Sequence, residues 1–379
     1  MEDVTKVVIV QEYVPQYRVP FFELLHRRAL DHDVDITVAS GFPGTALARR
    51  MDAQSLPFSV PIRQREFRIF GRRIVLRQLK RAVAGADLVI LEQARRNLDA
   101  YLMLSPPGRL RPSKIALWGH GRDYTRASGA VDRRLRRWLT LRSDWFFAYT
   151  RGGVDAVIGD GFRPSHVTLV QNSIDTASLS ESVRLITDEQ VRTFASMHDL
   201  RGKTALFIGA LDESKRLPWL LEAAEKCYER DGEFRLLVAG DGELRSQMEL
   251  SASEKTWLKY LGPLTGSHKA LAFAAAQVLA MPGRVGLVAV DSFAAAIPII
   301  TTAWAWHAPE FEYLDNDRNA VITSDQSHAF VEALHNLLND PALLLRLGRV
   351  CRADSELVTL SAMADNFLNG ILHALRASR

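Results

Sequence analysis

The strongest constraint on the fold is an alternation of short apolar runs with segments of helical periodicity. Residues 6–10 form an apolar run, a loop follows, and apolar side chains then recur at helical spacing from Val19 to Leu30. Strands that are apolar throughout and separated by helices predict a parallel sheet that is covered on both faces. The alternation continues to residue 170, with strands expected at 34–39, 86–91, 114–118, 145–149 and 167–170 and helices at 96–104 and 132–141.

The same alternation starts again after a polar stretch, so a second sheet is expected. At about 150 residues per domain, 379 residues suggest two domains. We predict an α/β protein with Rossmann-like domains at 1–175 and 203–355, a linker at 176–202, and a C-terminal helix within 356–379 that packs back on the first domain. The second set of strands is expected at 204–208, 234–239, 257–261, 277–280, 298–301 and 319–322, and helices at 217–227 and 243–251.

Composition excludes several classes of protein. Hydrophobic residues make up 47% and charged residues 24%, as in ordinary soluble domains. The two cysteines, Cys227 and Cys351, lie far apart and fit neither a disulfide-stapled fold nor a zinc site. The start of the chain lacks signal-peptide features, and no charge-free apolar window of 18 residues occurs. These features predict a cytoplasmic location and no transmembrane helix.

Charge is divided unevenly between the two halves. Residues 1–175 hold 28 basic and 18 acidic side chains, whereas the remainder holds 20 basic and 26 acidic ones. Most of the basic side chains in the first half are arginines, which bind phosphate through paired hydrogen bonds. This half is therefore expected to face an anionic membrane, a lipid-linked phosphate or nucleic acid, unless the arginines are merely a solvated surface.

A glycine turn after the 277–280 strand is the strongest candidate site. Its amides at 286–288 would point from a helix N-terminus and suit a diphosphate, and Asp291 would accept from ribose hydroxyls. A plain connection between strand and helix is the alternative interpretation. The candidate donor-binding residues of this turn are Gly283, Arg284, Val285, Gly286, Leu287, Val288 and Asp291.

Three further loops of the second half follow strands. Gly209 opens a loop that ends in Lys215 and Arg216, two cations that would neutralise phosphate charge or, alternatively, be solvated. Asp241 lies in a Gly-Asp-Gly turn, where it would line the site or simply cap a helix. Leu264 follows the 257–261 strand, where backbone groups would pair with a base edge.

Candidates in the first half also follow strands. His120 stands between two glycines after the 114–118 strand, a position exposed to the expected cleft, although single histidines are often structural. Glu92 follows the 86–91 strand. Tyr17 and Arg18 lie in the first loop between strand and helix, where an acceptor would bind. His120, Lys215 and Arg216 are the candidate catalytic residues, and Tyr17, Arg18 and Glu92 the acceptor-side ones.

These residues occur in segments that resemble retaining glycosyltransferases of family 4, also called glycosyl transferases group 1. The resemblance implies the GT-B fold, with two Rossmann-like domains facing each other across a cleft, the first for the acceptor and the second for the nucleotide sugar. Three positions depart from the family pattern: its paired glutamates fall on Gly283 and Asp291, and its loop arginine falls on Ala210. The matching segments are EYVPQYRVPFFELL, LWGHG, LVQNSIDT, GALDESKRLPWLLEAA, LLVAGDGEL, YLGPL and MPGRVGLVAVDSFAAAIPIITT.

The resemblance implies transfer of a hexose from a UDP- or GDP-sugar to an acceptor with retention of configuration. The acceptor would be a lipid-linked molecule or a glycan intermediate of bacterial polysaccharide assembly. Lys215 and the amides of the turn would stabilise the leaving diphosphate, and His120 would orient the sugar. No cofactor and no metal are expected, because the sequence has no cluster of metal ligands.

Other functions stay open at this point. Gly283 and Ala210 favour a catalytically impaired relative that binds a nucleotide or a lipid, and a sugar-nucleotide epimerase would use the same fold. A phosphorylase would need a longer chain. Nucleic-acid binding is not expected, because aromatic side chains are not interleaved with the arginines.

A stretch of arginines in the first half predicts contact with a membrane. From Arg72 onward, apolar side chains recur at helical spacing, which predicts a basic amphipathic helix on the cytoplasmic face of an anionic bilayer. The alternative is that this apolar stripe packs on the sheet of its own domain. The cations are Arg63, Arg65, Arg68, Arg72, Arg73, Arg77, Lys80 and Arg81, and the interleaved apolar residues are Phe67, Ile69, Phe70, Ile74, Val75, Leu76 and Leu79.

Overall fold

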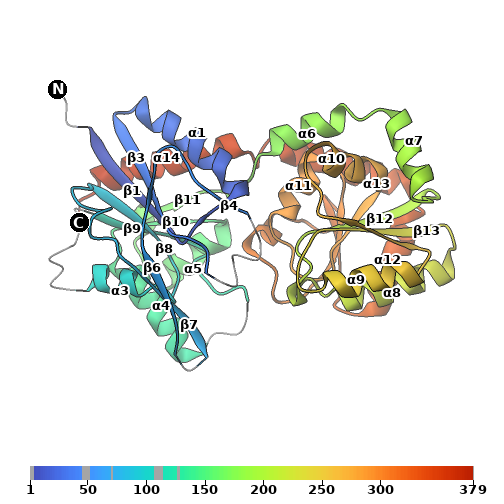
Figure 1. The fold of residues 1–379 in the computed structure, drawn as a ribbon, viewed down its shortest axis with the longest axis horizontal. Coiled ribbons are helices and arrows are strands. Elements are labelled where there is room, and N and C mark those ends of the chain that lie inside the picture. Colours follow the sequence, from blue (N-terminus) through green and yellow to red (C-terminus); the bar gives the residue numbers. More distant parts are fainter. Residues whose placement is uncertain (1–3, 45–51, 70, 106–113, 126–128, 379) are drawn as a thin grey trace. The chain divides into compact units, whose positions relative to one another are not determined.

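The computed structural model describes residues 4–44, 52–69, 71–105, 114–125 and 129–378. It divides into two compact units, one made of residues 1–174 with 360–379 and the other of residues 175–359. Each unit contains its own parallel sheet, as expected from the two runs of apolar strands (Figure 1).

The first unit is built on a parallel sheet of seven strands in the order β11-β10-β9-β8-β1-β3-β5. Because all seven strands run the same way, their carboxyl ends meet at one edge, and the residues that follow them are brought together there. The strands are β1 (Thr5–Gln11), β3 (Val34–Ser40), β5 (Ser59–Pro61), β8 (Leu88–Glu92), β9 (Lys114–Gly119), β10 (Trp145–Ala148) and β11 (Val167–Leu169).

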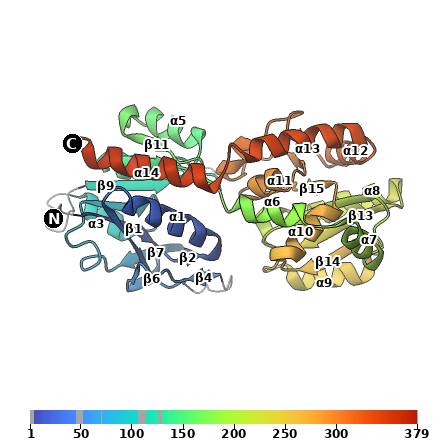
Figure 2. The ribbon, with the colours of Figure 1, turned by 90° about the horizontal axis from the view of Figure 1, so that it is seen from above.

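Helices cover both faces of this sheet. On one face, α1 (Val19–Leu30) packs beside the C-terminal helix α14 (Leu360–Arg376), and Phe367 of α14 stacks on Phe147 at 4.4 Å between ring centroids (Figure 2). The ammonium of Lys114 donates to the carbonyls of Ala374, Leu375 and Ala377, which lie at the end of α14. The second core cluster, on the other face, includes residues of α3 (Leu98–Leu104), α4 (Ala130–Arg142) and α5 (Arg151–Gly159).

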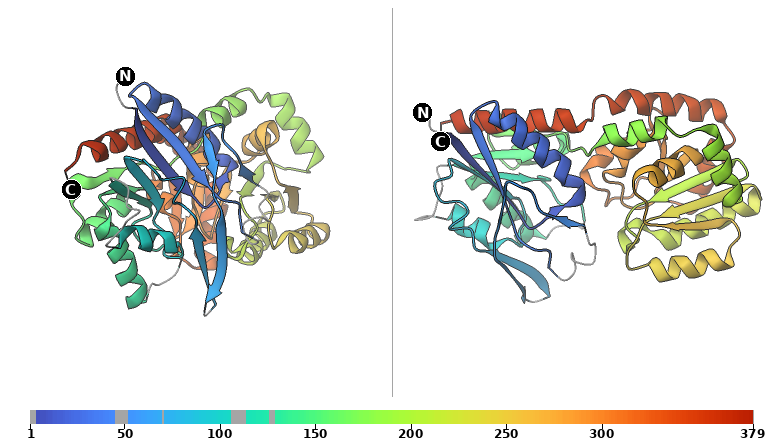
Figure 3. Two further views of the ribbon diagram at one scale, coloured as in Figure 1. Left: turned by 60° about the vertical axis from the view of Figure 1, so that its left-hand side comes forward. Right: turned by 45° about the horizontal axis from the view of Figure 1, so that its top comes forward.

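The stretch from Arg72 onward is not a helix, so that prediction is wrong. The chain forms an antiparallel hairpin of β6 (Gln64–Ile69) and β7 (Arg72–Arg77) (Figure 3). Val75, Leu79 and Val83 are buried in the core of this unit. The apolar spacing therefore reflects packing on the domain itself, the alternative interpretation of the same pattern. Phe70, which the prediction includes, lies outside the described residues.

The second unit has a parallel sheet of six strands in the order β14-β13-β12-β15-β16-β17. Two helices lie in the expected linker, α6 (Thr176–Arg184) and α7 (Asp188–Met197), and they pack on α10 (Gly266–Ala275) and belong to this unit. A capping box of Thr187 and Gln190 begins α7. The strands are β12 (Lys203–Ile208), β13 (Phe234–Ala239), β14 (Leu258–Gly262), β15 (Val278–Ala280), β16 (Ile299–Thr302) and β17 (Ala320–Thr323).

The helices of the second unit flank this sheet. The helix α8 packs on α12, and α11 packs on α6 and α13. Six residues of the Leu217–Arg230 helix form its buried apolar stripe, namely Leu217, Leu220, Leu221, Ala223, Ala224 and Cys227. The helices are α8 (Leu217–Arg230), α9 (Arg245–Glu254), α10 (Gly266–Ala275), α11 (Val288–Ala294), α12 (Ser327–Leu338) and α13 (Pro341–Ser355).

Candidate functional site

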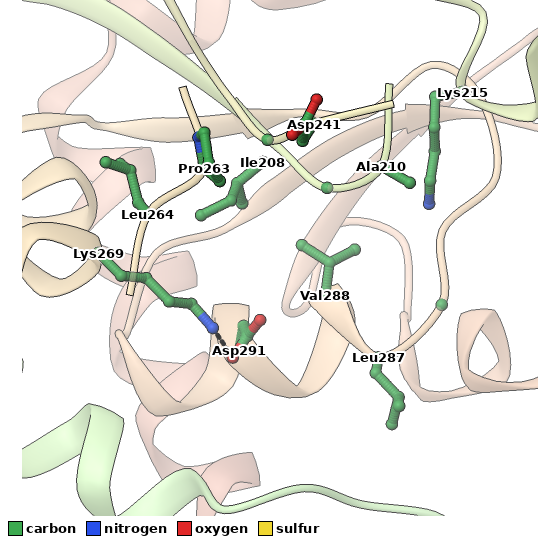
Figure 4. A pocket seen from close by; sticks show the side chains of 13 residues that line it. Ile208, Ala210, Lys215, Asp241, Pro263, Leu264, Lys269, Leu287, Val288 and Asp291 are labelled. Carbon is green, nitrogen blue, oxygen red and sulfur yellow. Dashed lines mark hydrogen bonds and ion pairs between the residues drawn. The ribbon is translucent and has the colours of Figure 1, made fainter. Parts of the chain in front are cut away.

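A pocket of about 370 Å³ opens at the carboxyl ends of the strands of the second unit. The loops after β12, β13 and β14 form one wall, and the turn that leads into α11 forms the other (Figure 4). This is where parallel sheets bind their ligands. The lining residues are Ile208, Gly209, Ala210, Lys215, Gly240, Asp241, Pro263, Leu264, Lys269, Gly286, Leu287, Val288 and Asp291.

Lys215 brings a buried cation to this pocket. Its ammonium donates to the carbonyl oxygen of Arg284 at 2.5 Å. Burial lowers the pKa of Lys215 to about 8, with a smaller lowering by Arg284 and opposing effects of Asp212 and Glu310. A weakly hydrated ammonium at a strand end is well suited to pair with the charge of a phosphate.

The turn before α11 presents backbone amides to the same pocket. Within the described part of the chain, the N–H groups of Gly286, Leu287 and Val288 donate to no protein acceptor. Amides of this kind must be satisfied by water or by a ligand. Together with Lys215 they form a set of donors for an anion.

Asp291 lies on the opposite side of the pocket from Lys215, on the first turn of α11. Its carboxylate is 2.8 Å from the ammonium of Lys269, which extends from α10 (Figure 4). Lys269 was not among the residues singled out from the sequence. A single lysine in an amphipathic helix has no pattern that distinguishes it from a solvated side chain.

Several other predicted residues surround the pocket without lining it. Arg216 ion-pairs with Asp325 at 2.5 Å, with its guanidinium over the rings of Trp219 and Trp304. Arg284 donates to the carbonyl of Trp306 at 3.0 Å, and burial lowers its pKa. Among the described residues, the pocket lining includes neither of these arginines, nor Gly283 or Val285.

Gly283 packs directly against the segment that carries Lys215. A Cβ atom at Gly283 would lie 2.5 Å from the backbone carbonyl of Lys215, closer than any side chain tolerates. The position where the family pattern has a glutamate is therefore sterically closed here. The glycine lets the turn approach the lysine loop, and Arg284 N–H then donates to the Ser214 carbonyl at 2.9 Å.

His307 holds the turn from behind and was missed by sequence reasoning. Its Nδ1 accepts from the Val285 amide at 3.0 Å, and its Nε2 donates to the Thr302 carbonyl at 2.8 Å. The ring stacks on Phe311 at 4.0 Å. Burial lowers the pKa of His307 to about 4, so the ring is neutral and keeps the tautomer that both hydrogen bonds require.

Asp241 and Leu264 both line the pocket. The Asp241 carboxylate accepts from the Gly242 amide at 2.8 Å and pairs with Arg245 at 3.4 Å. The aspartate therefore stabilises its own turn and does not cap α9, whose N-cap residue is Leu244. The side chain is exposed and lines the pocket.

His120 of the first unit lies at the carboxyl end of β9, among aromatic rings. Its ring is 4.6 Å from that of Tyr149 and 5.7 Å from that of Tyr124. Gly121 has φ of +72°, and a Cβ there would lie 2.4 Å from the Gly153 carbonyl. The glycine thus allows the loop to lie against α5, which fixes the position of His120.

Arg18 is nearly fully buried in the same unit, with 4% of its surface exposed. One amino group donates to the Asn172 side chain at 2.7 Å, and the guanidinium lies 5.2 Å from the centroids of both the Tyr17 and Trp118 rings. Among the described residues Arg18 has no carboxylate partner. Aromatic faces stabilise the buried cation instead.

Glu92 is part of a charged network rather than an open site. It accepts from the buried guanidinium of Arg77 at 2.8 Å and from the Glu12 amide at 3.1 Å. Asp99 binds the other side of Arg77 at 2.7 Å. Burial raises the pKa of Glu12, but Arg73 and Arg96 outweigh this effect and leave it lower than usual. This network anchors β7 to the ends of β1 and β8.

Neither a metal cluster nor a membrane-spanning helix is present in the described part of the chain. No group of three or more His, Cys, Asp or Glu side chains is arranged to hold a metal ion. The described helices are also too short or too polar to cross a bilayer.

Sequence comparison assigns the pocket to a known family. Residues 202–340, which contribute every side chain that lines the pocket, match the family described as "Glycosyl transferases group 1". This part of the second unit is therefore similar to a glycosyl transferases group 1 domain. The turn before α11 and the loop of Lys215 both lie within the matched residues.

Relatives and solved structures extend this comparison. A phosphatidyl-myo-inositol mannosyltransferase of Mycolicibacterium smegmatis is 26% identical over 192 residues, which are 49% of this chain and 46% of the relative. A protein of the same name from Mycobacterium tuberculosis is 31% identical over 136 residues, 32% of this chain and 35% of that relative. The chain therefore aligns with less than half the length of these curated relatives.

The fold similarity covers nearly the whole chain. The crystal structure of Anabaena Alr3699/HepE in complex with UDP superposes with a TM-score of 0.69 at 14% identity, covering 97% of this chain and 99% of the other. This similarity concerns the fold alone. Two parallel-sheet domains of this kind constitute the GT-B fold, which confirms the predicted fold class.

Proposed function

We propose that the protein is a retaining glycosyltransferase that moves a hexose from a nucleoside-diphosphate sugar to an acceptor hydroxyl. One observation carries the proposal: a single pocket of the segment that matches the group 1 family is lined by the Lys215 cation, by three unpaired amides of the turn before α11 and by the Asp291 carboxylate. A diphosphate would occupy the cationic side, and ribose hydroxyls would donate to Asp291.

The chain's own groups then lower the barrier to transfer. Lys215 and the amides of residues 286–288 would stabilise negative charge as the bond between the anomeric carbon and the phosphate oxygen breaks. The acceptor oxygen forms its new bond on the same face of the sugar, and its proton passes to the departing phosphate oxygen. His120 is proposed to orient the sugar, as its motif implies.

The proposed acceptor is a lipid-linked molecule or a glycan intermediate of bacterial polysaccharide assembly. The relatives named phosphatidyl-myo-inositol mannosyltransferases support a lipid acceptor, and mannose and inositol lipids are therefore the first substrates to try. The excess of arginine in residues 1–175 supports a peripheral location on the cytoplasmic face of a membrane. We propose that catalysis needs no metal and no further cofactor.

The test is release of nucleoside diphosphate from a panel of UDP- and GDP-sugars, with and without lipid acceptors. Wild-type protein is expected to release nucleotide from one donor and to form a product whose anomeric configuration matches the donor by NMR. Lys215→Ala is expected to lower turnover by roughly 10², while Lys226→Ala, an exposed lysine on α8, leaves it unchanged. Nucleotide binding without turnover on any donor would instead make the protein a binding module, and product of inverted configuration would exclude retention.

A further inference from the structure

Arg216 has a backbone conformation that arginine seldom adopts. Its φ is +55° and its ψ is +39°, in the left-handed region that favours glycine. The residue ends the short turn that contains Lys215 and is the N-cap of α8. A side chain larger than that of glycine costs free energy in this conformation, so it persists only where surrounding contacts compensate for the cost. The side chain of Arg216 makes such contacts.

Two indole rings and a carboxylate hold the guanidinium of Arg216. Its Cζ lies 4.9 Å from the ring centroid of Trp219 and 5.6 Å from that of Trp304. Its Nη1 donates to a carboxylate oxygen of Asp325 at 2.5 Å and to the carbonyl oxygen of Pro282 at 3.4 Å. Arginine can stack on rings while it donates hydrogen bonds, because its cation is planar, whereas lysine cannot. We call Arg216, Trp219, Trp304, Asp325 and the Pro282 carbonyl the Arg216 clamp.

The Arg216 clamp connects loops that follow four neighbouring strands. The strands β12, β15, β16 and β17 lie side by side in the sheet, and their carboxyl ends share one edge. Arg216 follows β12, and Pro282 follows β15. Trp304 follows β16, and Asp325 follows β17. One side chain therefore joins four loops at the edge of the sheet where the pocket opens.

Lys215 comes immediately before Arg216 and contacts the same turn. Its ammonium lines the pocket and donates to the carbonyl of Arg284 at 2.5 Å (Figure 4). Its backbone carbonyl lies 2.5 Å from where a Cβ atom of Gly283 would be. Pro282, which Arg216 contacts, is the residue before Gly283. Arg216 therefore holds both sides of this contact, the lysine loop through its own backbone and the turn through Pro282.

We propose that Arg216 is a positioning residue, which fixes the Lys215 ammonium against the turn before α11. The sequence motif predicts a catalytic role for Arg216 instead. Its guanidinium is, however, paired with Asp325, and it is not among the described residues that line the pocket. To reach a phosphate it would have to leave the carboxylate and both rings. The inference rests on the proposed function only for the ligand that Lys215 binds, because the position of Lys215 can be measured without a ligand.

The first experiment measures the pKa of Lys215 without a ligand, from the pH dependence of its acetylation by acetic anhydride, read by peptide mass spectrometry. Burial lowers this pKa to about 8. Arg216→Gly keeps the left-handed backbone and removes the clamp, so Lys215 should become solvated and its pKa should rise by about one unit or more. An unchanged pKa would overturn the proposal. The groups that face the ammonium stay the same in this variant, namely Asp212, Arg284, Glu310 and the neutral His307.

Asp325→Asn sharpens this experiment, because two causes predict opposite shifts. Loss of a nearby negative charge by itself lowers the pKa of a lysine. Loss of the clamp releases Lys215 from its buried position and raises that pKa. We expect a rise in Asp325→Asn, as in Arg216→Gly, whereas a fall would contradict a positioning role. Asp325 is exposed, so this variant also decides the question if Arg216→Gly does not fold.

The second experiment measures the binding of UDP and GDP by calorimetry. Arg216→Gly is expected to weaken binding by about tenfold, within the range of coupling between neighbouring residues. In a Lys215→Ala background the same change should have no further effect, because a positioning residue acts only through Lys215. Losses that add together would show that Arg216 contacts the phosphate itself, and they would overturn the positioning role.

Asp317→Gly is the matched control for the backbone. Asp317 is exposed, lies in the same unit and has φ of +61°, so the change relieves the same backbone conformation without altering the clamp. It is expected to leave the pKa of Lys215 and the nucleotide affinity as in the wild type. Equal effects of Asp317→Gly and Arg216→Gly would assign the result to the backbone and refute the clamp.

The two experiments separate this inference from the proposed function. Wild-type protein that binds neither UDP nor GDP would refute the proposed function, while the pKa of Lys215 would still decide the role of Arg216. Wild-type protein that binds a nucleotide, with the pKa of Lys215 unchanged in Arg216→Gly and Asp325→Asn, would refute the positioning role alone.

Discussion

The ammonium of Lys269 lies 2.8 Å from the carboxylate of Asp291, across the pocket wall formed by α10 and α11. Both side chains are largely buried, with 25% and 14% of their surfaces exposed. The pair fixes the orientation of Asp291 and leaves its second oxygen for a ligand. Asp291 is shorter than the glutamate of the family pattern, and its ion pair with Lys269 holds its carboxylate in place.

This pair leads to a prediction about nucleotide affinity. Asp291→Asn is expected to weaken binding of the nucleoside diphosphate by about tenfold, because an amide accepts fewer hydrogen bonds and leaves Lys269 unpaired. Lys269→Met should weaken binding as well, since it frees Asp291. Calorimetric titration of the two variants and of the double variant should give a coupling free energy of about 0.5–3 kcal/mol. Strictly additive effects would contradict a role for the pair in binding.

A second prediction concerns pH. Burial lowers the pKa of Lys215 to about 8, so the ammonium loses its charge as the pH rises through that value. Affinity for a nucleoside diphosphate is therefore expected to be constant between pH 6.5 and 7.5 and to fall by up to about tenfold per pH unit above 8. Titrations of the protein with a nucleoside diphosphate from pH 6.5 to 9.5 measure this affinity. The Lys215→Ala variant should lack this fall, and a wild-type affinity that is independent of pH would exclude Lys215 as the phosphate cation.

A third prediction concerns the glycine turn. Gly283→Ala places a Cβ where the backbone of Lys215 lies 2.5 Å away, so the turn must move apart from the lysine loop. We expect a loss of about 1–3 kcal/mol in the free energy of unfolding, the size of an overpacked contact, and weaker diphosphate binding. Gly283→Glu, which restores the family acid, should fare worse and not gain activity. Denaturant melts and nucleotide titration check both variants, with Gly232→Ala, where a Cβ meets open space, as the control.

A fourth prediction concerns His307. Its pKa of about 4 lies below the ordinary 6.5, so the unfolded chain binds a proton more readily than the folded chain. This contribution to stability is present above pH 6.5 and is lost as the pH falls toward 4, amounting to about 3 kcal/mol. Denaturant unfolding of wild type and of His307→Gln, at pH 7 and at pH 4.5, measures this contribution to the free energy of unfolding. The variant is expected to be less stable at pH 7 and to lose less stability on acidification.

Much of the fold could be predicted because its information is local. The strand β1 and the helix α1 follow directly from a run of apolar residues and from apolar spacing, and the structure places them where that pattern does. Residues 63–81 are different, since alternating arginines and apolar residues fit a helix and a hairpin equally well. The hairpin forms because β6 pairs with β7 and because Arg77 is buried between Glu92 and Asp99. The ion pairs of Arg77 join residues that are distant in sequence, so the local pattern does not indicate them.

In the candidate site, too, features that depend on local sequence could be predicted, and contacts between distant residues could not. Lys215 lies in a loop after one strand and Asp291 on the first turn of the helix that follows another, and their positions could be predicted because parallel strands bring their carboxyl ends together. The partners of these residues could not be predicted. His307 reaches Val285 from 22 residues away, and Asp325 pairs with Arg216 over 109 residues, so nothing in the sequence near the motif indicates them. The roles assigned to these side chains stay predictions until binding is measured.

The C-terminal helix gives the chain an unusual order of assembly. Met363, Phe367 and Ile371 of α14 are buried in the core of the first unit, although 185 residues of another unit separate them from it in sequence. During synthesis, residues 175–359 can leave the ribosome and fold while the first sheet still lacks one of its covering helices. The domain that is made first is then completed last. Ending translation before residue 360 would leave a finished second domain attached to a first domain with its apolar face open to solvent, a substrate for chaperones and proteases.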